Sequence, residues 1–102
     1  MMRFILPLML IAGSAAAQAP PMASEGLRVA RQWCAACHAV SRDMPPPAGD
    51  AVPGFPAVAA MPSTTETGLR VFLQTPHANM PNFQLSRAET DAVVAYLLSL
   101  RR

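Results

Sequence analysis

The chain has 102 residues, with eight basic and six acidic side chains and a formal net charge of +2 at pH 7. This length predicts a single domain. The sequence contains no lysine, no basic run and no basic patch interleaved with aromatic residues, which argues against a nucleic-acid-binding protein.

The first 17 residues have the three-part pattern of a secretory signal peptide. A positive start at Arg3 is followed by an apolar run that only Pro7 interrupts, and then by small residues in an A-x-A arrangement. The apolar run is well short of the ~20 residues that a membrane-spanning helix needs, so an export signal is favoured over a permanent anchor. Cleavage is expected after Ala17.

This pattern divides the chain into three expected segments. Residues 1–17 are the signal peptide, residues 18–23 are a flexible lead-in, and residues 24–102 are the folded domain. The mature protein is expected in the periplasm. Because a core of this size is marginal, a covalent staple or a large bound group is expected to complete it.

A first helix is expected over residues 25–36. Ser24 is the candidate N-cap, and Glu25 suits the first turn because its charge opposes the helix dipole. Four residues at helical spacing share one face of this helix. They are Leu27, Ala30, Cys34 and Cys37.

Residues 40–62 contain six prolines and predict a long loop without regular structure. A loop of this length is uncommon in a compact domain. It becomes reasonable if the loop wraps a large apolar ligand in place of a protein core. Phe55 and Val58 are the candidates to touch that ligand.

Two S-x-x-E patterns predict capping boxes at the starts of further helices. The first, Ser63 to Glu66, predicts a helix over residues 64–74 that Pro76 ends. The second, Ser86 to Glu89, carries the strongest helix signal, because an apolar stripe follows it. That stripe is Val93, Tyr96, Leu97 and Leu100. No strand pattern is evident, so an all-α fold is expected.

Cys34 and Cys37 are separated by two residues and followed at once by His38, which is the attachment signature of haem c. Haem carries two vinyl groups on neighbouring pyrrole rings. Thiols three positions apart, on about one helical turn, can reach both and form two thioethers. The next residue then lies under the haem plane, where its imidazole can bind the iron. One covalently attached haem c is therefore the predicted cofactor.

Three other interpretations of the two cysteines compete with haem attachment. A thioredoxin-type redox pair needs a strand–helix context, which the sequence does not offer. A structural zinc site needs four ligands, and the candidates are Cys34, Cys37, His38 and His77. Adjacent Cys37 and His38 are awkward as two corners of one tetrahedron. A disulfide between Cys34 and Cys37 would be strained within a helix.

The iron needs a second axial ligand or must leave that position open. The candidates are Met22, Met44, Met61, Met80 and His77. Met80 is favoured because Pro76 and Pro81 stiffen its loop, and a preorganised loop holds a weak thioether ligand at little entropic cost. A thioether favours Fe(II) and so raises the reduction potential. The predicted metal ligands are thus His38 and Met80, with Met61, or His77 in a bis-His haem, as alternatives.

On these residues the chain resembles the class I c-type cytochromes, over about residues 24–100. The resemblance rests on Cys34-Ala35-Ala36-Cys37-His38, on Gly26, on the Met-ligand loop at residues 76–83 and on the closing helix. In this family a glycine eight residues before the first cysteine lets the first helix cross the last one closely, against an aromatic residue such as Tyr96. Ala30 departs from the family, which often has an aromatic residue there.

The resemblance implies three to four helices wrapped around one haem, and electron transfer without enzymatic chemistry. It implies redox partner proteins as donor and acceptor, among which a dehydrogenase or a terminal oxidase would fit. The protein is expected to be a monomer or a weakly associated subunit, without stable membrane insertion. Two alternatives are an electron-accepting haem subunit of a periplasmic dehydrogenase complex, and a gas or redox sensor or weak peroxidase with an open iron position.

Overall fold

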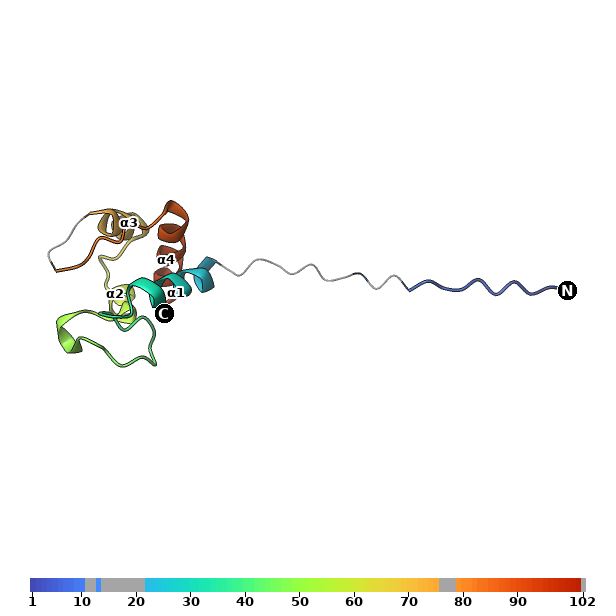
Figure 1. The fold of residues 1–102 in the computed structure, drawn as a ribbon, viewed down its shortest axis with the longest axis horizontal. Helices are drawn as coiled ribbons and strands as arrows, with labels where there is room; N and C mark the ends of the chain where they lie inside the picture. The colour runs from blue at the N-terminus through green and yellow to red at the C-terminus, as the bar shows by residue number, and fades with distance from the viewer. Residues whose placement is uncertain (11–12, 14–21, 76–78, 102) are drawn as a thin grey trace.

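The computed structural model describes residues 1–10, 13, 22–75 and 79–101. Their regular structure is helical, which confirms the all-α prediction (Figure 1). The elements are α1 (Met22–Trp33), the 3-10 turn η1 (Gly49–Ala51), α2 (Phe55–Ala60), α3 (Glu66–Gln74) and α4 (Arg87–Ser99). None of the helices in these residues has both the length and the apolar character needed to cross a membrane. The expected cleavage position at Ala17 lies outside the described residues.

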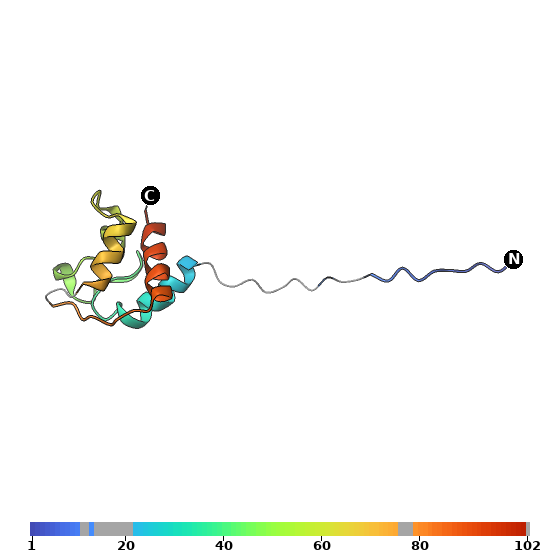
Figure 2. The ribbon, with the colours of Figure 1, turned by 90° about the horizontal axis from the view of Figure 1, so that it is seen from above.

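The crossing of α1 and α4 is the largest contact between helices and organises the domain (Figure 2). Gly26 is buried where the two helices meet. A Cβ atom at this position would overlap with the carbonyl oxygen of Ala92 and lie 2.7 Å from the Cβ atom of Tyr96. Only glycine allows this close approach, so the crossing predicted from Gly26 and Tyr96 is present.

The core lies beneath this crossing and continues into the proline-rich segment. Its buried members are Val29, Ala30, Val40, Phe55, Leu69, Val93, Val94, Tyr96 and Leu97. The Tyr96 hydroxyl donates a hydrogen bond to the carbonyl oxygen of Val40. This bond ties α4 to the chain just after His38, because a buried hydroxyl needs a partner. Ala30 is fully buried, so the small side chain is part of the packed crossing.

The boundaries of α1 differ from the prediction at both ends. The helix begins at Met22, so Ser24 lies inside it and the predicted N-cap is wrong. Met22 and Ala23 are good helix formers, and no residue in this stretch forces the helix to start later. Glu25 still lies in the first turn, where it accepts a hydrogen bond from Arg28 at 2.7 Å. The helix ends at Trp33, so the cysteine motif lies in the turn that follows.

The proline-rich segment is more ordered than expected, because α2 and η1 form within it. Pro56 lies at the start of α2, where its missing N–H group costs no intrahelical hydrogen bond. The prolines therefore exclude a long helix but permit this six-residue one. Phe55 is buried in the core, and Val58 packs against the core.

The first predicted capping box is wrong by two residues. The N-cap of α3 is Thr65, whose side chain accepts a hydrogen bond from the Gly68 amide at 3.0 Å. The Thr64 hydroxyl donates to the carbonyl oxygen of Val58 at 2.7 Å and completes the turn after α2. Ser63 is exposed and lies outside α3.

The capping box predicted at Ser86 is confirmed. The Ser86 hydroxyl accepts from the Glu89 amide at 3.1 Å, and the Glu89 carboxylate accepts from the Ser86 amide at 3.0 Å. Replacing Ser86 with alanine removes an N-cap, so the free energy of unfolding should fall by about 1 kcal/mol. Denaturant unfolding followed by circular dichroism measures this change.

A matched pair of variants supplies the control for this prediction. Thr65→Ala should cost a similar amount, whereas Ser63→Ala should change stability by less than about 0.5 kcal/mol, as exposed substitutions usually do. A larger loss from Ser63→Ala than from Thr65→Ala would show that α3 starts where the sequence pattern first placed it.

Candidate haem-attachment site

The turn after α1 presents the two cysteines and the histidine together. The amide of Cys34 donates to the carbonyl oxygen of Ala30 at 2.8 Å, so the chain leaves the helix without a break. The amides of Cys37 and His38 both donate to the carbonyl oxygen of Cys34, at 3.1 and 2.9 Å. These two hydrogen bonds hold Cys34, Cys37 and His38 together in one turn. Cys34 is half-buried, Cys37 is exposed, and both thiols are free.

His38 is held in one orientation by a hydrogen bond from its own ring. Its Nδ1 atom lies 2.7 Å from the carbonyl oxygen of Pro53, fifteen residues along the chain. A carbonyl oxygen only accepts, so Nδ1 carries the proton of this hydrogen bond, and Nε2 is the ring nitrogen left for a metal. A backbone partner of this kind fixes the ring of a metal-binding histidine and makes it more basic. The chain therefore presents an oriented imidazole.

The segment after the turn folds back over this imidazole. The Phe55 amide donates to the carbonyl oxygen of Ala39 at 2.8 Å, which brings the start of α2 beside His38. The rings of Phe55 and His38 have centroids 5.5 Å apart. The Phe55 ring is also 6.4 Å from that of Tyr96, so the histidine is backed by the core. The proline-rich segment is what holds His38 in place.

The electrostatics of Cys34 argue against a redox dithiol. Burial raises the pKa of the Cys34 thiol to about 11, so the thiol stays protonated at neutral pH. Reactive cysteines of thioredoxin-like sites have lowered pKa values instead. The described residues also contain no group of three or more Cys, His, Asp or Glu side chains that could hold a metal ion. The zinc alternative therefore has no support from them.

Met80 lies in the segment between α3 and α4 and is half-buried. Asn79 and Gln84 on either side have positive φ angles of 66° and 50°, and the Asn82 carboxamide accepts from the Gln84 amide at 3.0 Å. These features bend the segment sharply on both sides of Phe83. Pro76 and His77 lie outside the described residues.

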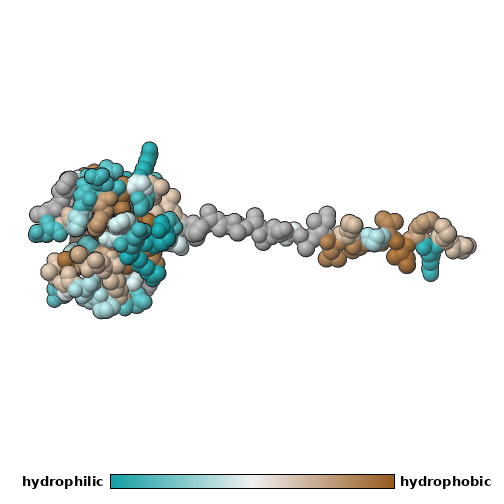
Figure 3. Space-filling model, viewed as in Figure 1, coloured by the Kyte–Doolittle hydropathy of each residue, from teal (hydrophilic) through white to brown (hydrophobic). Residues whose placement is uncertain are grey.

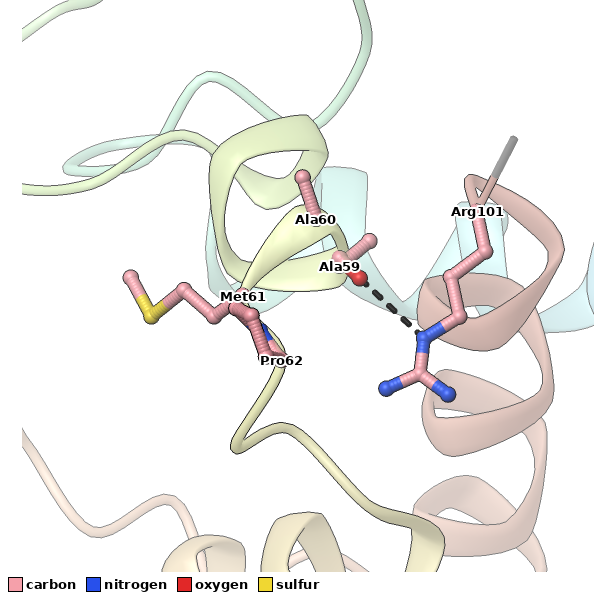
Figure 4. Close-up of a pocket in the computed structure, with 5 residues that line it drawn as sticks. All are labelled: Ala59, Ala60, Met61, Pro62 and Arg101. Atoms are coloured by element: carbon pink, nitrogen blue, oxygen red, sulfur yellow. Dashed lines mark hydrogen bonds between the residues drawn. The ribbon is translucent and has the colours of Figure 1, made fainter.

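The other methionines are placed differently. Met22 is exposed at the start of α1, and Met44 packs against the core. Met61 is 43% exposed and lines a cavity of about 300 Å³ beside Arg101, away from which its side chain extends (Figure 4). Arg101 donates to the carbonyl oxygens of Ala59 and Thr64 and so ties the end of the chain to α2. Met61 therefore borders the contact between Arg101 and the end of α2.

Trp33 and Phe83 join the two halves of the site, and sequence reasoning missed both. Their ring centroids lie 5.3 Å apart. Trp33 directly precedes Cys34, and Phe83 follows Met80 by three residues. The position of Trp33 next to the cysteine motif is a signal that could have singled it out. The hydrogen bond from His38 to Pro53 could not be expected from the sequence, because any residue can supply a carbonyl oxygen.

The residues present fit a covalently attached haem. Two free thiols lie three positions apart on one turn, and the imidazole beside them has its outer nitrogen available. An all-α domain with such a turn defines the class of c-type cytochromes.

Comparison with known proteins identifies the family. The family model described as "Cytochrome C oxidase, cbb3-type, subunit III" matches residues 21–97, and the chain belongs to this cytochrome c family. It is 37% identical over 100 residues to Cytochrome c-552 of Bradyrhizobium diazoefficiens, an alignment that covers 98% of this chain and 95% of that protein. No solved structure matches the chain.

These findings confirm the resemblance to class I c-type cytochromes. The protein is a haem c electron-transfer protein, and its cofactor is covalently bound haem c. The chain contains two cysteines, Cys34 and Cys37. As an electron carrier it exchanges electrons with redox partners.

Proposed function

We propose that the protein is exported to the periplasm and carries single electrons between other proteins, with His38 and Met80 as the axial ligands of one haem c. The observation that carries this proposal is the hydrogen bond between His38 Nδ1 and the carbonyl oxygen of Pro53 at 2.7 Å. It orients the ring and leaves Nε2 as the nitrogen available to bind iron. When bound, the haem supplies a one-electron Fe(II)/Fe(III) couple.

Three further residues are proposed to hold the haem. Cys34 and Cys37 are the proposed attachment points, with Cys34 anchored against the core and Cys37 open to solvent. Met80 is the proposed sixth ligand, because a soft thioether stabilises Fe(II) and raises the reduction potential relative to a second imidazole. With both axial positions filled, no position stays open for a substrate, which supports a carrier and not an enzyme.

Export to the periplasm is supported by the N-terminal pattern. Residues 1–10 are exposed, and Figure 3 shows that most of them are apolar. We propose residues 1–17 as the signal peptide, 18–23 as the lead-in and 24–102 as the cytochrome c domain. The alignment with Cytochrome c-552 covers 98% of this chain, so that relative has a counterpart to nearly all of it.

The proposed partners are a donor and an acceptor protein, reached through apolar contact near the haem edge. Val71, Phe72 and Phe83 expose 58%, 45% and 46% of their surface. These three side chains are the candidates for such contact. The family description names a subunit of a terminal oxidase, so a permanent place in an oxidase or dehydrogenase complex is the second candidate.

The absorption spectrum of the purified protein tests the proposal. The protein is made in a host that matures c-type cytochromes and is measured oxidised and reduced. We expect haem that resists extraction with acidified organic solvent, a low-spin spectrum, and the weak red band of methionine–iron ligation. A colourless protein with two free thiols would overturn the proposal. A high-spin spectrum with ready carbon monoxide binding would favour a sensor or weak peroxidase.

A further inference from the structure

The Trp33–Phe83 contact joins the two segments that must meet at the iron. Trp33 ends α1 and directly precedes the attachment turn, while Phe83 lies in the segment that carries Met80. Their ring centroids are 5.3 Å apart and the ring planes are tilted by 37°. This separation is in the range where aromatic pairs attract each other beyond the effect of surface burial.

The segment around Met80 needs such an attachment. Asn79, Pro81, Asn82 and Gln84 are all exposed, and the hydrogen bond from the Gln84 amide to the Asn82 carboxamide stays within the segment. Leu85 packs against the core only where α4 is about to begin. The ring of Phe83 reaches from this segment to another element. That contact therefore restrains the Met80 segment from outside the segment itself.

Two features indicate that the pair does not serve the core. Trp33 remains 38% exposed and Phe83 remains 46% exposed, and neither belongs to the buried cluster. The two rings therefore meet at the surface of the domain and outside its buried core. Their contact contributes mainly by joining two surface segments.

We propose that Trp33 and Phe83 form an aromatic clasp that positions Met80, holding the ligand segment against the haem-attachment turn. The clasp rests on the proposed function, since it presumes that Met80 binds the iron. Opening the clasp frees the Met80 segment and exposes the sixth position. The clasp thus sets how often an external ligand can displace the thioether.

Competition by imidazole tests the clasp in the oxidised holoprotein. Imidazole can bind the iron only after Met80 has left it. The apparent affinity for imidazole is therefore the affinity of the open iron for imidazole multiplied by the equilibrium constant for release of Met80 from the iron. Trp33→Leu and Phe83→Leu should each raise it by roughly 3- to 10-fold, which corresponds to the loss of one aromatic pair. The double variant should bind imidazole no more tightly than either single variant, because both remove the same interaction. Trp33→Phe keeps a ring and should stay within about 2-fold of the wild type.

The outcomes separate failure of the clasp from failure of the proposed function. If the wild type lacks the red band, Met80 is not the ligand and the proposed function fails first. If the band is present but both leucine variants keep wild-type imidazole affinity, the clasp is wrong. Effects that simply add in the double variant also overturn it, as does a loss of unfolding stability without any change in imidazole affinity. Should Trp33→Leu fail to fold, Phe83→Leu and Trp33→Phe still decide the question.

Discussion

Gly26→Ala is expected to destabilise the protein by about 3 kcal/mol, a large part of the stability of a domain this small. The added methyl group would overlap with the carbonyl oxygen of Ala92, which is backbone and cannot rotate away. The helices would have to separate, and the packing of Tyr96 against α1 would loosen with them. Unfolding by denaturant, followed by circular dichroism and haem absorbance, measures the loss.

Gly68→Ala is the matched control, since Gly68 is also a helical glycine but lies on the exposed side of α3. A Cβ atom there meets only the Thr65 hydroxyl, at 3.0 Å, and that side chain can shift. The gain in helix propensity offsets the crowding, so the change should stay within about 1 kcal/mol. Equal losses from the two substitutions would mean that the α1–α4 crossing is not the tight contact described above.

Local sequence patterns predicted the elements that depend on local interactions. The box at Ser86 and Glu89 forms as expected, because both hydrogen bonds lie within four residues and an apolar stripe follows. The box at Ser63 and Glu66 fails for a nonlocal reason. The Thr64 hydroxyl donates to the carbonyl oxygen of Val58, and the N-cap of α3 is Thr65. A capping pattern alone could not show that competition.

The short helix α2 was missed because its sequence carries little helical signal. It has six residues, begins with a phenylalanine and a proline, and has no side-chain cap. What holds it is tertiary contact, through the buried ring of Phe55 and the bond from its amide to Ala39. Such short helices are marginal in isolation and form where packing supports them.

The candidate site also has one part that depends on neighbouring residues and one part that depends on nonlocal contacts. The motif from Cys34 to His38 is contiguous, so the sequence alone located it and indicated its chemistry. The support of His38 by Pro53 spans fifteen residues and uses a backbone oxygen, which no side-chain pattern marks. The contact between Trp33 and Phe83 joins positions fifty residues apart (83 − 33 = 50) and appears only in the folded chain. A contiguous motif can be recognised in the sequence, whereas the nonlocal contacts that position it cannot.

Met80→Ala is expected to remove the red band of the oxidised protein and lower the reduction potential. Without the thioether, Fe(II) loses a soft donor, and water or an external ligand enters the sixth position. The fall should be on the order of 0.1–0.3 V, a part of the ~0.8 V range that axial ligands cover. The reduced variant should also bind carbon monoxide readily. Redox titration and the absorption spectrum measure these changes together.

Met80→His shows whether the changes in Met80→Ala come from losing the thioether or from leaving the sixth coordination position of the iron without a protein ligand. An imidazole there should restore a low-spin, six-coordinate spectrum and resist carbon monoxide, yet leave the potential below that of the wild type. Met61→Leu is the control methionine variant. Met61 is exposed beside Arg101, so its replacement should leave both the red band and the potential unchanged.

The same set of variants decides between the remaining ligand assignments. If Met61→Leu abolishes the red band and Met80→Ala does not, Met61 at the end of α2 is the thioether ligand. Met80 then does not bind the iron. If Met80→Ala stays low-spin and six-coordinate while His77→Ala does not, the haem is bis-His. That result would also remove the reason for a high potential, because a second imidazole favours Fe(III) more than a thioether does. The sixth ligand therefore determines both the absorption spectrum and the reduction potential of the protein.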